Sequence, residues 1–139
     1  MASNVRILSE AQCLTRLSDQ RIGRVSVTRG ALPVIVPVNY VADGTSIVFR
    51  TNRDGMLLGA CDGNVVAFET DEFSADADAG WSVLIIGVAH RLTTSEHVRA
   101  LSLGLVTAAG DDCDEFIRLR VGRISGREIT AGSLSLLAG

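Results

Sequence analysis

The stretch SIVFRTNRDGMLLGAC, residues 46–61, decides how the rest of the chain is interpreted. Its first six residues form a run rich in β-branched and aromatic side chains, which predicts a strand that ends at Thr51. Residues 52–55 have the composition of a tight turn, and residues 56–61 are predicted to form a short helix. Arg50 and Thr51 therefore stand where a strand ends and a helix begins, an arrangement that favours an anion. An arginine at a surface strand end explains the same pattern, so this stretch alone indicates only a weak anion site.

Short strands dominate the remainder of the chain. Apolar runs and alternating patterns predict six strands, at residues 22–28, 32–41, 46–51, 65–70, 81–92 and 116–124. Turn signals at residues 29–30 and 43–44 join neighbouring strands as hairpins. Capping boxes that begin at Ser9 and Thr93 predict helices over about residues 10–18 and from Thr93 to about residue 107.

These elements favour an antiparallel barrel over a parallel Rossmann sheet, because the strands do not alternate strictly with helices and no GxGxxG motif is present. We therefore predict a mainly β fold: a six-stranded antiparallel barrel with two or three short helices, two of which cover its open ends. No repeat or linker divides the chain. Residues 1–139 are accordingly predicted to form one domain, with a core of about residues 8–130.

The composition excludes several kinds of function. All 13 basic residues are arginines, so neither a Schiff-base lysine nor a P-loop lysine is available. A net charge of −3 and few aromatic residues argue against a nucleic-acid partner. Three widely spaced cysteines without a CxxC pair predict free thiols in a reducing cytosol. We see no signal peptide, and the longest apolar run, residues 83–89, is too short to cross a membrane, so a cytoplasmic protein is expected.

No residue pattern predicts a metal site. His90 and His97 are too far apart for a helical ligand pair, and His97 is expected to be exposed at a helix start. The acidic segment 71–80 is predicted to be a solvated loop. Arg118, Arg120 and Arg123 form a basic ladder, which is typical of a solvent-facing strand paired with acids but is also compatible with contact to an anion.

Six short motifs occur in a characteristic order. They are IGRV at 22–25, PVNY at 37–40, FRT at 49–51, VAFE at 66–69, GWSV at 80–83 and GR at 126–127. In order and spacing they resemble the pyridoxamine 5'-phosphate oxidase-related family of flavin mononucleotide (FMN)-binding split β-barrels. The resemblance covers about residues 8–129, and it is more specific for the fold than for a reaction.

The resemblance implies a homodimer with FMN between the protomers. The cofactor phosphate would be held by Arg50 and Thr51, and the flavin ring would lie beside Pro37, Val38 and Asn39. The strand start at Trp81 and Ser82 often contacts the cofactor in this family, although core or dimer packing would also explain the tryptophan. Arg127 would brace the site or the dimer.

One departure from the family pattern affects the phosphate end of the site. Relatives usually carry a lysine where this chain has Met56, followed here by Leu57, and Arg53 in the same turn is a candidate substitute. The resemblance therefore implies a flavin-dependent oxidoreductase acting on a small organic substrate, without an assignable catalytic residue. The alternatives are a non-catalytic dimer that binds a deazaflavin, haem or another planar ligand, and a barrel without any cofactor.

Overall fold

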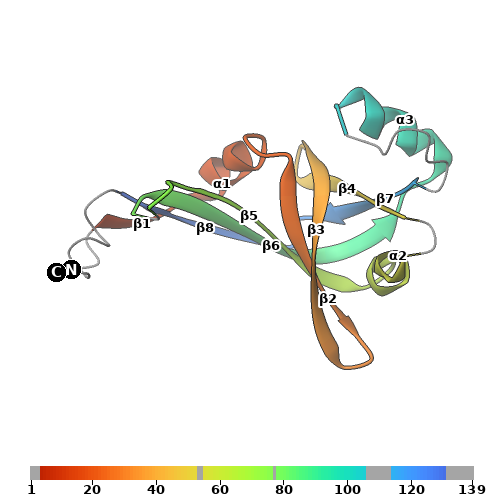
Figure 1. Ribbon diagram of the computed structural model, residues 1–139. Coiled ribbons are helices and arrows are strands. Elements are labelled where there is room, and N and C mark those ends of the chain that lie inside the picture. Colours follow the sequence, from red (N-terminus) through yellow and green to blue (C-terminus); the bar gives the residue numbers. More distant parts are fainter. Residues whose placement is uncertain (1–3, 53–54, 77, 106–113, 131–139) are drawn as a thin grey trace.

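Six antiparallel strands close into a barrel in the computed structural model, which describes residues 4–52, 55–76, 78–105 and 114–130 (Figure 1). The strands of the ring are β2 (Ile22–Arg29), β3 (Leu32–Asp43), β4 (Ser46–Asn52), β5 (Val65–Phe73), β6 (Gly80–Arg91) and β7 (Asp114–Arg120). They pair in the order β2–β3–β4–β7–β6–β5, and β5 returns to β2. The predicted six-stranded barrel is confirmed.

Strand β6 is long enough to pair with two different strands, one after the other, along the same edge. Its first half, Gly80 to Ile86, pairs with β8 (Arg123–Ile129), and residues 89–91 pair with β7. The far side of β8 pairs with β1 (Val5–Ile7), a strand that the sequence analysis missed. The sheet is therefore split: one part closes the barrel, and the other extends beside it as an open ribbon (Figure 1).

The predicted single strand over residues 116–124 is wrong, because the chain changes partners in its middle. Val121 donates to the carbonyl of Thr45, and the next residue, Gly122, donates to the carbonyl of Ile86. The strands approach so closely here that a Cβ atom on Gly87 would lie 1.9 Å from the carbonyl oxygen of Arg120. Only glycine fits at such a contact, so this crossing fixes where β7 ends and β8 begins.

The barrel interior is filled by the inward-facing side chains of every strand in the ring. Fully buried members include Val25, Tyr40, Phe49, Phe68, Val83, Ile85, Ile117 and Leu119. Tyr40 packs edge-on against Phe68 and donates its hydroxyl to the carbonyl of Leu17 at 2.5 Å. This bond ties the helix before the barrel to the core, since it satisfies a buried polar group.

Three helices surround the barrel, as predicted. α1 (Glu10–Leu17) begins with the predicted capping box of Ser9 and Gln12 and contributes Cys13 and Leu17 to the core. α2 (Met56–Cys61) contributes Leu57 and Cys61 and contacts β2, β4, β6 and β7.

α3 (Thr94–Ser102) lies outside the barrel rather than over an end, and with Val48 and Phe116 it forms a second, smaller core. It stops at Ser102, short of the predicted residue 107, and Gly104 follows with φ +93°. His97 is not exposed as expected, because its ring lies 4.6 Å from that of Phe116.

In two places the structure has a strand where the sequence predicts a loop. β5 continues to Phe73, three residues into the predicted acidic loop, because residues 71–73 pair with residues 80–82 of β6. Residues 108–114 are also predicted from the sequence to form a loop, but Asp114 begins β7, opposite Asn52. The apparent loop signal came from polar residues that a strand carries on its outward face.

Candidate functional site

A pocket of about 480 Å³ opens between β3, the end of β4 and the start of α2. Its described lining residues are Ile22, Val36, Pro37, Val38, Asn39, Arg50, Thr51, Gly55, Met56 and Leu57. We call it the strand-end pocket. Its residues come from the first residue of β2, from β3, from the end of β4 and from the start of α2.

The two ends of the strand-end pocket differ in polarity. Arg50 and Thr51 form one end, and Gly55, which precedes α2, has no side chain to cap the first helical amides. Val36, Pro37 and Val38 supply an apolar wall from β3. An anion is favoured at the first end and a flat apolar group along the wall, which is a common design for small-molecule sites.

Seven of the predicted site residues line this one pocket: Pro37, Val38, Asn39, Arg50, Thr51, Met56 and Leu57. The sequence analysis missed Ile22, Val36 and Gly55. Ile22 lies opposite Asn39 because the hairpin turn is formed by Gly30 and Ala31, one residue later than the predicted turn. Arg53 lies outside the described residues.

Three predicted residues lie elsewhere within the chain. Trp81 is buried in the core beside α1, with the guanidinium carbon of Arg16 5.3 Å from its ring centre. Ser82 and Arg127 face each other across β6 and β8 in the open ribbon. None of the three lines the strand-end pocket of the same protomer.

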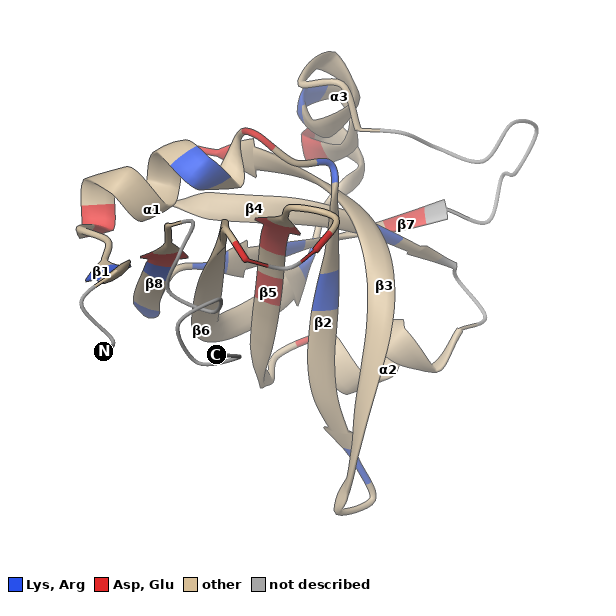
Figure 2. Ribbon diagram, turned by 60° about the vertical axis from the view of Figure 1, so that its left-hand side comes forward, with Lys and Arg blue, Asp and Glu red and all other residues tan. Residues whose placement is uncertain are grey.

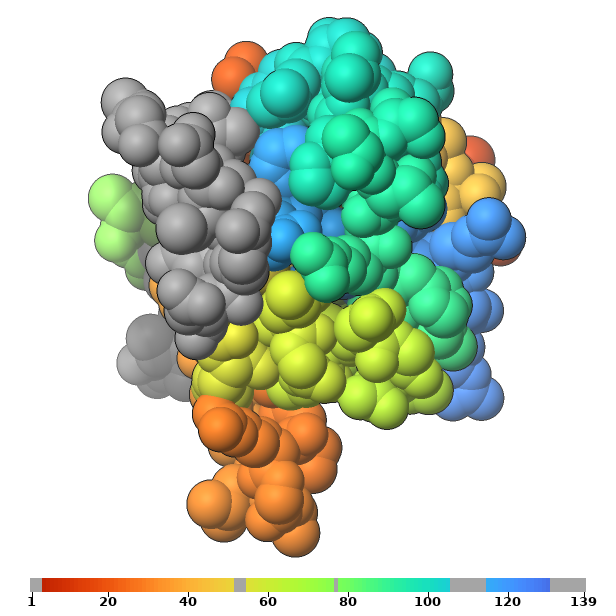
Figure 3. Space-filling view, turned by 90° about the vertical axis from the view of Figure 1, so that its right-hand side faces the viewer, coloured from red at the N-terminus to blue at the C-terminus, as the bar shows by residue number. Residues whose placement is uncertain are grey.

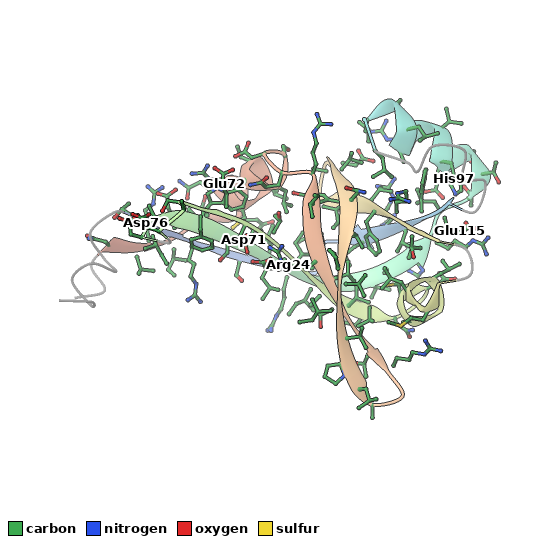
Figure 4. The ribbon with its side chains drawn as sticks, in the orientation of Figure 1. Arg24, Asp71, Glu72, Asp76, His97 and Glu115 are labelled. Carbon is green, nitrogen blue, oxygen red and sulfur yellow. The ribbon has the colours of Figure 1, made fainter. Side chains whose placement is uncertain are left out.

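An ion pair between a buried glutamate and a half-exposed arginine stands next to the polar end of the pocket. Glu115, opposite Thr51 across β4 and β7, has a side chain only 4% exposed. Figure 4 shows Glu115 at the start of β7. Arg91 donates to it through two nitrogens, at 2.7 and 3.2 Å. This pair could not be predicted from the sequence, since 24 residues separate its members. It anchors the end of β6 to the start of β7 and so steadies the neighbouring Thr51.

The lining offers little acid–base chemistry. Among the described residues that line the strand-end pocket, Arg50 is the only one with an ionisable side chain. Arginine stays protonated in proteins and is a poor proton donor or acceptor. The described lining is therefore suited to binding and orienting a ligand rather than to proton transfer.

Neither a metal centre nor a membrane segment is found in the described part of the chain. No three His, Cys, Asp or Glu residues of residues 4–52, 55–76, 78–105 and 114–130 come together in a way that could hold a metal ion. None of the described helices is long and apolar enough to span a bilayer.

The fold and the strand-end pocket together define a split-barrel protein with a pocket lined by one described arginine and by apolar side chains. Residues 9–128 match the family model described as pyridoxamine 5'-phosphate oxidase, and the chain belongs to this family. The predicted family is confirmed.

Individual relatives support the same assignment. The uncharacterized protein Rv0080 of Mycobacterium tuberculosis is 32% identical over 102 residues, which cover 70% of this chain and 67% of the relative. The FAD binding protein from Mycobacterium smegmatis is 28% identical, with a TM-score of 0.76 over 88% of this chain and 96% of its own. The conserved protein of unknown function DIP1874 from Corynebacterium diphtheriae is 32% identical, with a TM-score of 0.77 over 92% and 100% of the two chains.

Proposed function

We propose that this protein binds a flavin nucleotide in the strand-end pocket and uses it as an oxidoreductase on a small organic substrate. The observation that carries the proposal is the position of Arg50 and Thr51 at one end of an apolar slot. This arrangement suits a phosphate joined to a flat ring. The FAD-binding relative supports a flavin over other planar anions.

Each part of the pocket has a role in this proposal. Arg50 and Thr51 would bind the phosphate, and Pro37 and Val38 would lie along the ring with Asn39 at its polar edge. When bound, the flavin supplies hydride or electron transfer, while the protein supplies position and electrostatics. Among the described lining residues, none is an acid or a base suited to proton transfer, which agrees with this division.

The identity of the flavin depends on the phosphate end. We propose FMN, because the described pocket offers one arginine for one phosphate. FAD is the alternative, since a relative of similar length binds it. Met56 removes a charge-assisted hydrogen bond that a lysine would make, at a cost of about 1.5–3 kcal/mol.

A homodimer is part of the proposal, because one chain leaves the pocket open. Pro37 and Ile22 are exposed at its rim, whereas bound small molecules are usually mostly buried. The outer face of β2, β3, β5 and β6 also exposes six large apolar side chains, between 39% and 69% each: Ile22, Ile35, Val65, Phe73, Leu84 and Val88. A second copy on this face would cover the patch and close the pocket.

The middle of this face carries an ion cluster that suits such an interface. Arg24 on β2 bonds to Glu69 and Asp71 on β5, at 2.5 and 2.8 Å. Figure 2 shows the basic part of β2 beside the acidic part of β5. Burial, together with the neighbouring Asp71, raises the pKa of Glu69 to about 7. At neutral pH the cluster therefore holds less negative charge than two free carboxylates would, which lowers the cost of covering it.

A non-catalytic role is the second candidate, favoured by Met56 and by the lining without an acid or base. In that case the dimer would store or carry a flavin, a deazaflavin or haem. The two functions differ in turnover: the proposed enzyme reoxidises or reduces its flavin with a small organic substrate, and the carrier does not.

The test is a titration of the purified protein with FMN and with FAD, followed by flavin fluorescence. Saturable quenching at micromolar or tighter affinity is expected, with one flavin per protomer. Bound flavin would then be reduced and its reoxidation by a panel of small organic molecules measured. Failure of both flavins to bind would contradict the proposal, and titrations with deazaflavin and haem would then separate the remaining alternatives.

A further inference from the structure

A second concavity lies between the end of β6, the first turn of α3 and the outward face of β7. Its volume is about 380 Å³. His90, Arg91, Glu96, Arg118 and Arg120 supply its polar lining, and Val88 and Leu92 add apolar surface. Figure 3 faces this side of the molecule, with α3 above the end of β6 and α2 below. We call it the arginine pocket.

Two of the three arginines are held in place by acids behind the pocket. Arg118 is only 18% exposed, and its Nη1 donates to Asp43 at 3.0 Å and to Ser46 at 2.6 Å. Arg91 donates to the buried Glu115 through Nε and Nη2. Both guanidinium groups are therefore positioned before any ligand arrives, which reduces the entropy lost on binding.

The positive charge is not fully compensated on the open side. Arg120 follows Arg118 by two residues on the same face of β7, is exposed, and forms no ion pair with a described residue. His90 stands opposite Arg118 across β6 and β7. An arginine without a partner beside a second, fixed arginine is the arrangement that binds phosphate or carboxylate oxygens through paired N–H donors.

Glu96 narrows the kind of anion that fits. Its Oε1 accepts from the backbone N–H of Thr93 at 3.0 Å, and hydrogen bonds from Thr93 lower its pKa. Its Oε2 remains 3.9 Å from the Nε of Arg118. A carboxylate at the rim disfavours a bare anion and favours a ligand that also carries hydroxyl donors, while Val88 and Leu92 suit an apolar ring.

We propose that the arginine pocket is a second binding site, which takes the phosphate of a small nucleotide-like ligand between Arg118 and Arg120. The phosphate has two potential sources. One is a free nucleotide. The other is the end of FAD that lies away from the flavin ring, because the two pockets are close together. Arg50 of the strand-end pocket is paired with Phe116 on β7, and Phe116 lies two residues, about 7 Å along the strand, from Arg118. Only the second source rests on the proposed flavin function.

The first arm of the test uses AMP with the full-length protein, followed by calorimetry. The variant is Arg120→Gln, which removes an exposed charge without breaking an ion pair among the described residues. Arg29→Gln, at the tip of the hairpin between β2 and β3, removes one charge far from the pocket and is the matched control. At least a tenfold loss of AMP affinity is expected in Arg120→Gln, with wild-type affinity in Arg29→Gln. An equal loss in both variants would mean general charge attraction and would overturn the proposal.

The second arm compares FMN with FAD in the same variants. If the far end of FAD is the occupant, Arg120→Gln lowers FAD affinity about tenfold and leaves FMN affinity unchanged. If AMP binds in an Arg120-dependent way while neither flavin binds, the arginine pocket stands and the proposed flavin function fails. If Arg120→Gln changes neither AMP nor FAD affinity, the proposal is wrong.

Discussion

The two pockets of this molecule offer an anion different arrangements of side chains. The strand-end pocket has one arginine at the end of an apolar slot, and its residues come mostly from two short segments, 36–39 and 50–57. The arginine pocket has three arginines beside the apolar side chains of Val88 and Leu92, and its residues come from β6, α3 and β7. The first arrangement suits a large flat ligand with a single phosphate. The second suits a smaller ligand whose phosphate meets more than one arginine.

The largest effect is expected from removing the charge of the strand-end pocket. Arg50→Ala should weaken flavin binding about a hundredfold, because charge-assisted hydrogen bonds to the phosphate are lost. AMP binding in the arginine pocket should stay unchanged. Fluorescence titration with FMN and calorimetry with AMP measure the two effects, and wild-type FMN affinity in this variant would remove Arg50 from the site.

A charge placed on the proposed dimer face should weaken ligand binding in the strand-end pocket, which needs the partner subunit, and should leave binding in the arginine pocket unchanged. Ile35→Glu puts a carboxylate on a side chain that is 69% exposed in one chain, so the monomer should fold normally. We expect a monomer by sedimentation velocity and at least a tenfold loss of flavin affinity, since the strand-end pocket would stay open. AMP affinity should not change. A stable dimer of this variant would rule out this face as the interface.

Restoring the missing charge should strengthen one pocket only. Met56→Lys places an ammonium group at the phosphate end and should raise flavin affinity roughly ten- to a hundredfold. Met56→Leu, which keeps the side chain apolar, is the matched control and should bind like the wild type. An unchanged affinity in Met56→Lys would show that position 56 does not reach the phosphate.

The smallest effect is expected on stability, from removing the charge of Asp43, which holds Arg118 in the arginine pocket. Arg99 and Arg118 hydrogen-bond to Asp43 and lower its pKa from 3.8 to about 2. The stabilisation by this carboxylate is therefore complete above about pH 4 and is lost as the pH falls through about 2. Asp43→Asn should cost about 1–2 kcal/mol at neutral pH and should flatten the stability profile between pH 4 and 2. Urea unfolding at a series of pH values measures the loss of stability and its pH dependence. An unchanged stability profile would contradict the stabilising role of the Asp43 carboxylate.

The same contrast explains what the sequence could predict. The strand-end pocket was largely predictable, because a strand end, a turn and a helix start follow one another between Ile47 and Leu57. Of the arginine pocket, only a basic ladder was predicted from the sequence. The sequence grouped Arg123 with Arg118 and Arg120, but the chain changes partners at Gly122, so Arg123 lies on β8 instead. Contacts such as Arg118 with Asp43 depend on strand register, which alternation alone does not fix.

The continuity of β6 has a consequence for how the molecule opens. Residues 80–86 pair with β8 of the open ribbon and also with β5 of the barrel, and residues 89–91 pair with β7 of the barrel, without an interruption of the strand. The ribbon therefore has no boundary at which it could detach as a separate folding unit. Amide protons of Leu84 to Ile86, with a paired strand on each side, should exchange with solvent only when the whole molecule unfolds, whereas those of the edge strand β1 exchange through local fraying.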